Sequence, residues 1–318
     1  MKAIHLIAPS GASLDTKSPV AGIKWLQTQG IQIENAASVE RVFERFAGSD
    51  QERLAELNQL AQVSPKTLVM AMRGGYGIHR LLPDIQWAAI AKAVQGGLQI
   101  CGHSDFTAFE LALLAKTGAM TLSGPMLNYD FGRSQDDGQA ITPDQFMWQH
   151  FQEAVDERKL DCEVNTRQSF LGDASTKALS GILWGGNLTV LASLVGSPYM
   201  PNSAQTQGGI LFLEDVNEHP YRIERMLMQL LDAGILSNQG AILLGGFSAY
   251  RLYDNDRGYS LQSTIGAIRG RLPNSVPILT GLPFGHQTDK LTLPVGVKAS
   301  LTYSPERFTL QAQWSILK

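Results

Sequence analysis

The chain has 318 residues, a formal net charge of −3, and 44% hydrophobic residues. This length is typical of two domains, and the composition is that of a globular protein with a sizeable core. A weak negative charge gives no basic surface for nucleic acid or for an anionic membrane, so a small molecule or a peptide is the expected ligand. The N-terminal apolar run is too short for a secretory signal, and no run approaches the ~18 apolar residues of a membrane span. We therefore expect a cytoplasmic protein.

Two cysteines, Cys101 and Cys162, lie far apart in the sequence and form neither a disulfide framework nor a metal-binding pair. The sequence contains no HExxH motif, and the acidic run at 254–256 lacks the rest of a calcium loop. We expect reduced thiols, no metal ion and no other cofactor.

Short apolar runs alternate with amphipathic segments in the first half of the chain. This alternation is typical of an α/β protein with a parallel sheet that helices cover on both faces. A polar, glycine-containing stretch at 128–138 is predicted to be a loop, and Thr142 is placed to cap a helix that runs to about Lys159. The hydrophobic spacing predicts strands at 4–8, 31–33, 67–72 and 98–101, and helices at 20–29, 50–63, 85–94 and 106–116.

A second α/β series follows a polar, mixed segment at 161–177, which we interpret as a linker. The predicted domains are therefore residues 1–160 and 178–318. The end of the chain, at 299–303 and 308–313, is typical of a hairpin. In the second domain the pattern predicts strands at 182–184, 210–213, 241–244 and 277–279, and helices at 188–195, 221–231 and 261–271.

The segment Gly102–Thr107 follows a predicted strand and opens a predicted helix. Such a turn lifts a serine hydroxyl away from the sheet, and the helix N-terminus supplies free N–H groups and a positive dipole end for a developing oxyanion. Ser104 is therefore a candidate nucleophile, although serine and aspartate are also common helix caps, which leaves Ser104 or Asp105 a purely structural alternative. His103 is a poor candidate for the base, since adjacent side chains at a turn diverge.

Glycines follow another predicted strand, in the run Arg73–Gly77. Glycine at the carboxyl end of a parallel strand lets a ligand approach the backbone closely, although a tight turn explains glycines equally well. The run matches neither a Walker loop nor GxGxxG. Arg73 is a candidate for binding a substrate carboxylate, with a solvated turn residue as the alternative.

Two further candidates lie in the second half. Glu214 and Asp215 end an apolar strand, where open α/β sheets place their ligands, so one of them can orient a histidine. The structural alternative is that Asp215 caps a nearby turn. His286 follows a Gly/Pro loop after a strand, and its near-neutral pKa suits a general base. An isolated loop histidine is otherwise an exposed bystander.

In chain order, these segments resemble the LD-carboxypeptidase family, the muramoyltetrapeptide carboxypeptidases. The likeness covers nearly the whole chain. The matching segments are APSG at 8–11, RGGYG at 73–77, GHSDFTA at 102–108, GPM at 124–126, WGGNLTVL at 184–191, LFLEDVNEHPYRIERML at 211–227 and GLPFGH at 281–286.

The resemblance implies a flavodoxin-like or amidotransferase-like N-terminal domain and a smaller C-terminal α/β domain, with the active site in the groove between them. It implies a triad in which Ser104 is the nucleophile, His286 the base and Glu214 the residue that orients it. The oxyanion hole would then consist of the N–H groups of Asp105 and Gly75, with Arg73 and Gly74 as substrate-binding residues.

The expected activity is removal of the terminal D-alanine from a murein tetrapeptide, in peptidoglycan recycling, by a homodimer that needs no cofactor. One alternative within the superfamily is a peptidase like the microcin C resistance protein, which cleaves aminoacyl-adenylate-type conjugates. Such relatives carry a longer aromatic loop insertion, whereas the segment between Glu214 and His286 is compact here. The other alternative is a ligand-binding protein without catalysis.

Overall fold

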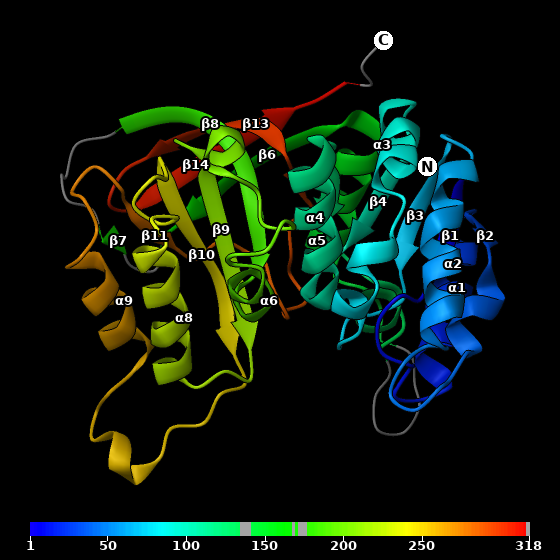
Figure 1. Ribbon diagram of the computed structural model, residues 1–318, viewed down its shortest axis with the longest axis horizontal. Helices are drawn as coiled ribbons and strands as arrows, with labels where there is room; N and C mark the ends of the chain where they lie inside the picture. Colours follow the sequence, from blue (N-terminus) through cyan, green and yellow to red (C-terminus); the bar gives the residue numbers. More distant parts are fainter. Residues whose placement is uncertain (134–140, 167–168, 171–176, 316–318) are drawn as a thin grey trace.

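The computed structural model describes residues 1–133, 141–166, 169–170 and 177–315. The protein has two lobes, each built around one β-sheet (Figure 1). The first half of the chain makes most of the lobe drawn in blue and cyan, and the second half makes the lobe that carries β8–β11. The predicted two-part α/β fold is confirmed.

Six strands form the sheet of the first lobe, in the order β12-β5-β4-β3-β1-β2. β1 to β5 run parallel, whereas β12 comes from the far end of the chain and pairs antiparallel with β5. Every residue of β3 is buried, as in a central strand covered on both faces. The strands are β1 (Ala3–Ile7), β2 (Gln32–Glu34), β3 (Thr67–Ala71), β4 (Gln99–Gly102), β5 (Thr121–Ser123) and β12 (Leu293–Val295).

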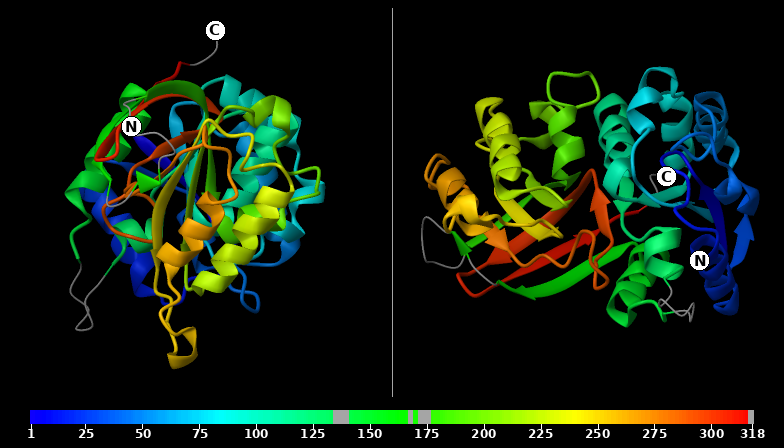
Figure 2. Two further views of the ribbon diagram at one scale, coloured as in Figure 1. Left: turned by 90° about the vertical axis from the view of Figure 1, so that its left-hand side faces the viewer. Right: turned by 90° about the horizontal axis from the view of Figure 1, so that it is seen from below.

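Eight strands form the second sheet, in the order β6-β14-β13-β8-β9-β10-β11-β7. β8 to β11 run parallel, and β13, β14 and β6 extend the sheet antiparallel. In Figure 2 the red strand β14 runs from the second lobe towards the first. The strands are β6 (Lys159–Asn165), β7 (Ser169–Phe170), β8 (Lys177–Asn187), β9 (Ile210–Val216), β10 (Ala241–Ser248), β11 (Ile278–Thr280), β13 (Val297–Tyr303) and β14 (Arg307–Gln313).

Helices cover the sheets, and α4 lies where the two lobes meet. Residues 107–114 of α4 are all buried, and α4 packs against α3 of its own lobe and against α6 and β8 of the other. The α-helices are α1 (Lys17–Thr28), α2 (Asp50–Gln59), α3 (Trp87–Gln95), α4 (Thr107–Thr117), α5 (Gln145–Gln152), α6 (Leu188–Ser193), α7 (Ser203–Thr206), α8 (Pro220–Asp232) and α9 (Leu261–Arg269). The shorter 3₁₀ and π turns are Ala36–Glu40, Leu60–Gln62, Ile78–Arg80, Leu82–Asp84, Ser104–Phe106, Leu127–Phe131, Glu153–Glu157 and Asp254–Asp256. Among the described residues, no helix has the length and hydrophobicity needed to cross a membrane.

The structure differs from the predicted elements in several places. The loop predicted at 128–138 begins in the π turn Leu127–Phe131, and its residues from 134 onward lie outside the described residues. The helix predicted to run from Thr142 is instead capped by Asp144, and α5 is followed by a π turn that ends at Arg158 in a left-handed conformation. The segment 161–177, predicted as a linker, contributes most of β6 and all of β7, while 167–168 and 171–176 lie outside the described residues. β12 was not predicted, and it returns the chain to the first sheet.

Candidate active site

Ser104 lies at the carboxyl end of β4, in the short turn that leads into α4. Its backbone φ is +63°, in the left-handed region that non-glycine residues seldom adopt. Unfavourable backbone conformations of this kind cluster at functional sites, where the surrounding structure holds them. Ser104 is half-buried and lines a cavity.

The hydroxyl of Ser104 contacts a histidine that lies 182 positions away in the sequence. The distance from Ser104 Oγ to His286 Nε2 is 3.1 Å, and His286 Nδ1 lies 2.8 Å from Glu214 Oε2. In this arrangement Nδ1–H donates to the carboxylate and Nε2 accepts from the serine hydroxyl. The structure therefore brings together the three side chains that the sequence had singled out.

Glu214 is fully buried at the end of β9, and Asn187 holds its second oxygen. Asn187 Nδ2 donates to Glu214 Oε1 over 3.0 Å. Burial lowers the pKa of His286, but the charge and the hydrogen bond of Glu214 outweigh burial, so this pKa lies above its usual value. The carboxylate thus stabilises a protonated imidazole next to Ser104.

Gly285 explains why a glycine precedes the histidine in the GLPFGH segment. Its φ is +123°, and a Cβ atom there would lie 2.9 Å from Glu214 Oε2. Glycine therefore lets His286 approach the buried carboxylate.

Asp215, the neighbour of Glu214, has a different set of partners. Its carboxylate accepts hydrogen bonds from the backbone N–H and the hydroxyl of Thr189, at 2.9 and 2.7 Å, and from Asn187 Nδ2 at 3.2 Å. Burial raises the pKa of Asp215 to about 6, assisted by the nearby charge of Glu214. Asp215 thus fixes the start of α6, and its hydrogen bonds go to Thr189 and Asn187.

The glycine turn after β3 packs directly against Ser104. A Cβ atom on Gly74 would lie 2.6 Å from Ser104 Oγ and 3.2 Å from the backbone nitrogen of Asp105. The buried Asp105 side chain points away from the hydroxyl and accepts from Ser10 Oγ at 2.8 Å and from the N–H of Ile78 at 3.2 Å. Asp105 therefore ties the GHSD segment to the APSG segment and to Ile78, the residue that follows RGGYG. Sequence reasoning had not assigned Ser10 to this unit.

A second buried cluster lies on the other side of Ser104. His103 Nδ1 is 2.9 Å from the carbonyl oxygen of Gly124, and its Nε2 is 3.4 Å from Lys290 Nζ, which in turn lies 2.8 Å from Asp130 Oδ1. Burial, followed by the charge of Lys290, holds the pKa of His103 well below its usual value. His103 is thus neutral and engaged elsewhere, consistent with its exclusion as the base. Lys290, in a loop, and Asp130, in the π turn Leu127–Phe131, are residues that the sequence analysis missed.

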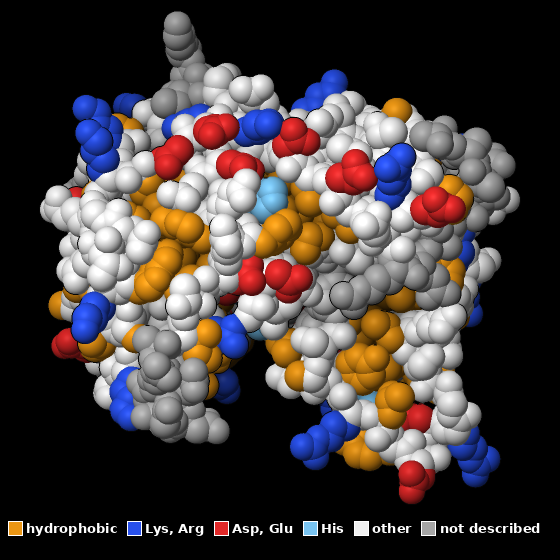
Figure 3. Space-filling view, turned by 180° about the vertical axis from the view of Figure 1, so that it is seen from behind, with side chains coloured by type: hydrophobic (Ala, Val, Ile, Leu, Met, Phe, Trp, Pro, Cys, Tyr) orange, Lys and Arg blue, Asp and Glu red, His pale blue; other side chains and the backbone are white. Residues whose placement is uncertain are grey.

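A cavity of ≈ 570 Å³ opens beside Ser104 and His286, lined by residues of both halves of the chain. Arg73, Tyr129 and Arg133 line it from the first half, and Asn217 and Gln287 from the second. Seen from behind, the surface is hollowed between the lobes at its lower edge (Figure 3).

Arg73 lines this cavity with a partly satisfied guanidinium group. Its Nη1 donates to the carbonyl oxygen of Ala12 over 2.7 Å, whereas its buried Nε has no partner among the described residues. Arg73 is half-buried and held by this hydrogen bond, so the arginine is part of the wall of the cavity.

Metal-binding clusters and reactive thiols are not features of the described residues. No group of three or more His, Cys, Asp or Glu side chains among them is arranged to hold a metal ion. Cys101 and Cys162 are buried free thiols, and burial raises the pKa of Cys162 to about 12.

A serine, a histidine and a buried glutamate in mutual contact beside a cavity have the geometry of a hydrolase site of the Ser–His–acid kind. Comparison with known sequences is more specific. Residues 4–124 match the family description LD-carboxypeptidase N-terminal domain, and residues 180–301 match LD-carboxypeptidase C-terminal domain. The chain belongs to the LD-carboxypeptidase family.

Three relatives illustrate the range of the family. The crystal structure of muramoyltetrapeptide carboxypeptidase from Oxalobacter formigenes is 41% identical, has a TM-score of 0.85, and covers 98% of this chain and 99% of its own. The murein tetrapeptide carboxypeptidase of Pseudomonas aeruginosa is 29% identical over 94% of this chain and 92% of its own. The microcin C7 self-immunity protein MccF of Escherichia coli is 26% identical over 92% of this chain and 88% of its own.

Proposed function

We propose that this chain is a serine carboxypeptidase that hydrolyses the bond between the third residue and the terminal D-alanine of a murein tetrapeptide. The observation that carries the proposal is the chain of contacts from Ser104 to His286 to Glu214 at the wall of the cavity. The names of the relatives from O. formigenes and P. aeruginosa support the substrate class.

In the proposed first half-reaction, Ser104 Oγ attacks the carbonyl carbon of the scissile bond while its proton passes to His286 Nε2. The charge of Glu214 stabilises the resulting imidazolium. His286 then donates that proton to the leaving nitrogen, the carbon–nitrogen bond breaks, and free D-alanine departs. The remaining tripeptide is an ester of Ser104.

In the second half-reaction, a water molecule attacks the ester carbonyl and gives its proton to His286. The bond to Ser104 breaks, the serine recovers its proton from His286, and the tripeptide leaves as a carboxylic acid. No metal ion or redox partner takes part in this sequence.

The proposed oxyanion hole consists of the N–H groups of Asp105 and Gly75. Asp105 lies in the first turn of a helical segment, where backbone N–H groups have no partner within the helix. Gly74 brings the glycine turn against that nitrogen. Loss of one such donor lowers turnover by about 10²–10³-fold in serine hydrolases.

The terminal carboxylate of the substrate requires a cationic partner, and Arg73 supplies it in this proposal. Its guanidinium is anchored to Ala12 on one side, which leaves the rest of the planar group for a carboxylate. Removal of only the last residue follows, because the anchored carboxylate must lie one residue beyond Ser104.

The direct test is an incubation with a purified murein tetrapeptide, with and without a chelator, in which free D-alanine and tripeptide are quantified. A tetrapeptide that ends in L-alanine is the matched control, and an aminoacyl-sulfamoyl adenosine is the competing substrate. We expect D-alanine and tripeptide in equal amounts, unaffected by the chelator. Cleavage of the adenosine conjugate alone would replace the proposed substrate, and cleavage of neither would reject the enzymatic proposal.

A further inference from the structure

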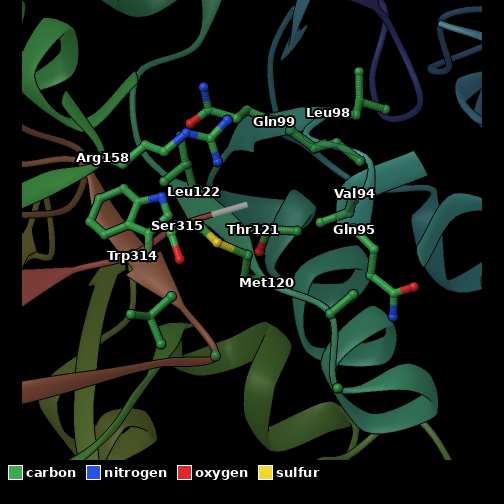
Figure 4. A pocket seen from close by; sticks show the side chains of 15 residues that line it. Val94, Gln95, Leu98, Gln99, Met120, Thr121, Leu122, Arg158, Trp314 and Ser315 are labelled. Atoms are coloured by element: carbon green, nitrogen blue, oxygen red, sulfur yellow. The ribbon is translucent and has the colours of Figure 1, made fainter. Parts of the chain in front are cut away.

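A second cavity lies at the end of the first sheet opposite to Ser104. It has a volume of ≈ 260 Å³ and is formed by the starts of β4 and β5, the ends of α3 and α4, and the segment that follows β14 (Figure 4). Ser104 follows the carboxyl end of β4, whereas Gln99, which lines this cavity, begins that strand. The cavity is therefore separate from the candidate active site.

Three polar side-chain atoms in the wall of this cavity are buried without a hydrogen-bond partner among the described residues. They are Thr121 Oγ1, Trp314 Nε1 and Gln99 Oε1. Thr121 is 1% exposed and Trp314 8% exposed, so neither side chain has ready access to bulk water. Buried polar groups are nearly always paired in native proteins, and three orphans in one cavity indicate a missing partner.

A hydrogen bond from the NH₂ group of the Gln99 side chain fixes the orientation of its amide. Gln99 Nε2 donates to the carbonyl oxygen of Val155 over 2.9 Å, which leaves Oε1 as the atom that needs a donor. Trp314 Nε1 is a donor only and needs an acceptor. The missing partner therefore carries both an acceptor and an N–H or O–H group.

The positive charge in the wall of the cavity indicates that the acceptor on the missing partner is an anion. Arg158 lines the wall, and its Nη2 donates to the carbonyl oxygen of Gly97 over 3.3 Å. No lining residue is acidic, and no carboxylate of the described residues forms an ion pair with Arg158. The backbone N–H of Trp314 donates to the carbonyl oxygen of Arg158 over 3.1 Å, which keeps the cation and the indole donor together.

Apart from Gln95 and Ser315, the remaining wall is apolar, and the space is small. Val94, Leu98, Ile100, Leu122 and Val297 supply aliphatic surface. The volume lies below the range of about 300–1,000 Å³ that holds drug-sized ligands. A compact ligand with an aliphatic part therefore matches the cavity.

We propose that this cavity binds a small carboxylate compound with an aliphatic body and one amide N–H, such as an N-acylated apolar amino acid. The carboxylate accepts from Arg158 and from Trp314 Nε1–H, and the amide N–H donates to Gln99 Oε1. The aliphatic part packs on the strands of the first sheet.

The indole N–H of Trp314 provides a specific probe for this site by heteronuclear NMR. The chain contains five tryptophans, and the signal that disappears in Trp314→Phe identifies the one at position 314. N-acetyl-L-leucine is titrated into the full chain to about 10 mM, because a ligand with few atoms binds weakly. N-acetyl-L-leucinamide, which lacks the carboxylate, is the neutral control.

We expect the Trp314 indole signal to move saturably with N-acetyl-L-leucine and to stay in place with the amide. Arg158→Gln should weaken binding by about 10- to 100-fold, the usual effect of one charge-assisted hydrogen bond. Arg271→Gln, at an exposed position, should leave it unchanged.

A stationary Trp314 signal, an equal response to the amide, or undiminished binding in Arg158→Gln would overturn the proposal. If Arg158→Gln fails to fold, the comparison of N-acetyl-L-leucine with its amide on the unmodified chain still tests the proposal. Because the readout is position 314, it is independent of whether the chain cleaves murein tetrapeptides.

Discussion

Two histidines flank Ser104, and their surroundings give them opposite properties. The rings of His103 and His286 are 5.2 Å apart, centre to centre. His286 lies against the buried carboxylate of Glu214, and its pKa is raised although burial opposes this. His103 lies against the ammonium group of Lys290, and burial together with that charge lowers its pKa strongly.

At His286 the neighbouring carboxylate outweighs burial, whereas at His103 burial and the neighbouring ammonium group lower the pKa together. A histidine that exchanges protons with Ser104 needs an anion behind it, because that anion stabilises the imidazolium. A histidine that only supports the turn is kept neutral, and its Nε2 faces a cation. Both halves of the chain supply these surroundings. Glu214, beside His286, comes from β9 in the second half, and Asp130, which pairs with the Lys290 that faces His103, comes from the first half.

The largest expected effect follows from neutralising the anion behind His286. Glu214→Gln keeps the shape of the side chain but removes the charge that stabilises the imidazolium, so turnover of the tetrapeptide should fall by about 10³–10⁴-fold. Asp215→Asn is the matched control, because Asp215 contacts Thr189 and Asn187 and makes no hydrogen bond with His286. Its turnover should fall less than about tenfold, with stability lowered by about 1–3 kcal/mol. Equal losses of turnover in both variants would contradict the assignment of the orienting acid.

The cation beside His103 can be removed in the same way. Lys290→Met leaves the carboxylate of Asp130 buried without its partner, which typically destabilises a protein by about 3–5 kcal/mol. Denaturant unfolding measures the loss. The double variant with Asp130→Asn should recover much of it, since no unpaired charge remains. Unchanged stability in Lys290→Met would contradict a stabilising role for the buried ion pair between Lys290 and Asp130.

A substitution that crowds the contact between the glycine turn and Ser104 is expected to lower activity by an intermediate amount. In Gly74→Ala the new methyl group would lie 2.6 Å from Ser104 Oγ, so kcat/KM should fall by about 10²-fold while the protein remains folded. Gly266→Ala, in α9, adds a methyl group with no atom within 4 Å and should stabilise the protein by up to about 1 kcal/mol. Full activity in Gly74→Ala would place the hydroxyl elsewhere during catalysis.

The smallest expected effect is a shift in the pH dependence of kcat/KM. The proposed base is the neutral form of His286, so kcat/KM should fall as pH drops through a pKa above the usual value of 6.5. In Glu214→Gln, burial still lowers the pKa of His286 but the carboxylate no longer raises it. The acidic limb of the profile should therefore move to lower pH, measured on the residual activity. An unmoved limb would mean that another group sets it.

Much of the first sheet could be predicted from the sequence, because its strands are short apolar runs that end at glycine or at a helix cap. The strand expected at 67–72 is β3, and the one at 98–101 is β4, each within a residue. Most of β6 falls in the segment predicted as a linker, although Leu160, Cys162 and Val164 alternate with polar residues and all three are buried. Period-two alternation in a half-polar segment was the signal that could have identified this strand.

The site was harder to predict than the fold, because its contacts join residues far apart in the chain. Motif position placed Ser104 and Glu214 at the ends of strands, where parallel sheets collect their functional groups. Nothing local distinguishes Asp130 and Lys290 from solvated loop residues, and only the folded chain brings them together at 2.8 Å. The distant pairing of β12 with β5 brings the segment that contains Lys290 back to the first lobe.

The most direct test of the central claim is the rate of D-alanine release by Ser104→Ala, measured beside Ser180→Ala, which alters a serine on β8 that bonds to Ser300. We predict that loss of the hydroxyl lowers turnover by about 10⁴–10⁶-fold, as in other enzymes with a serine nucleophile, while Ser180→Ala keeps full activity. Release of D-alanine by Ser104→Ala at a rate close to that of the unmodified protein would contradict the account.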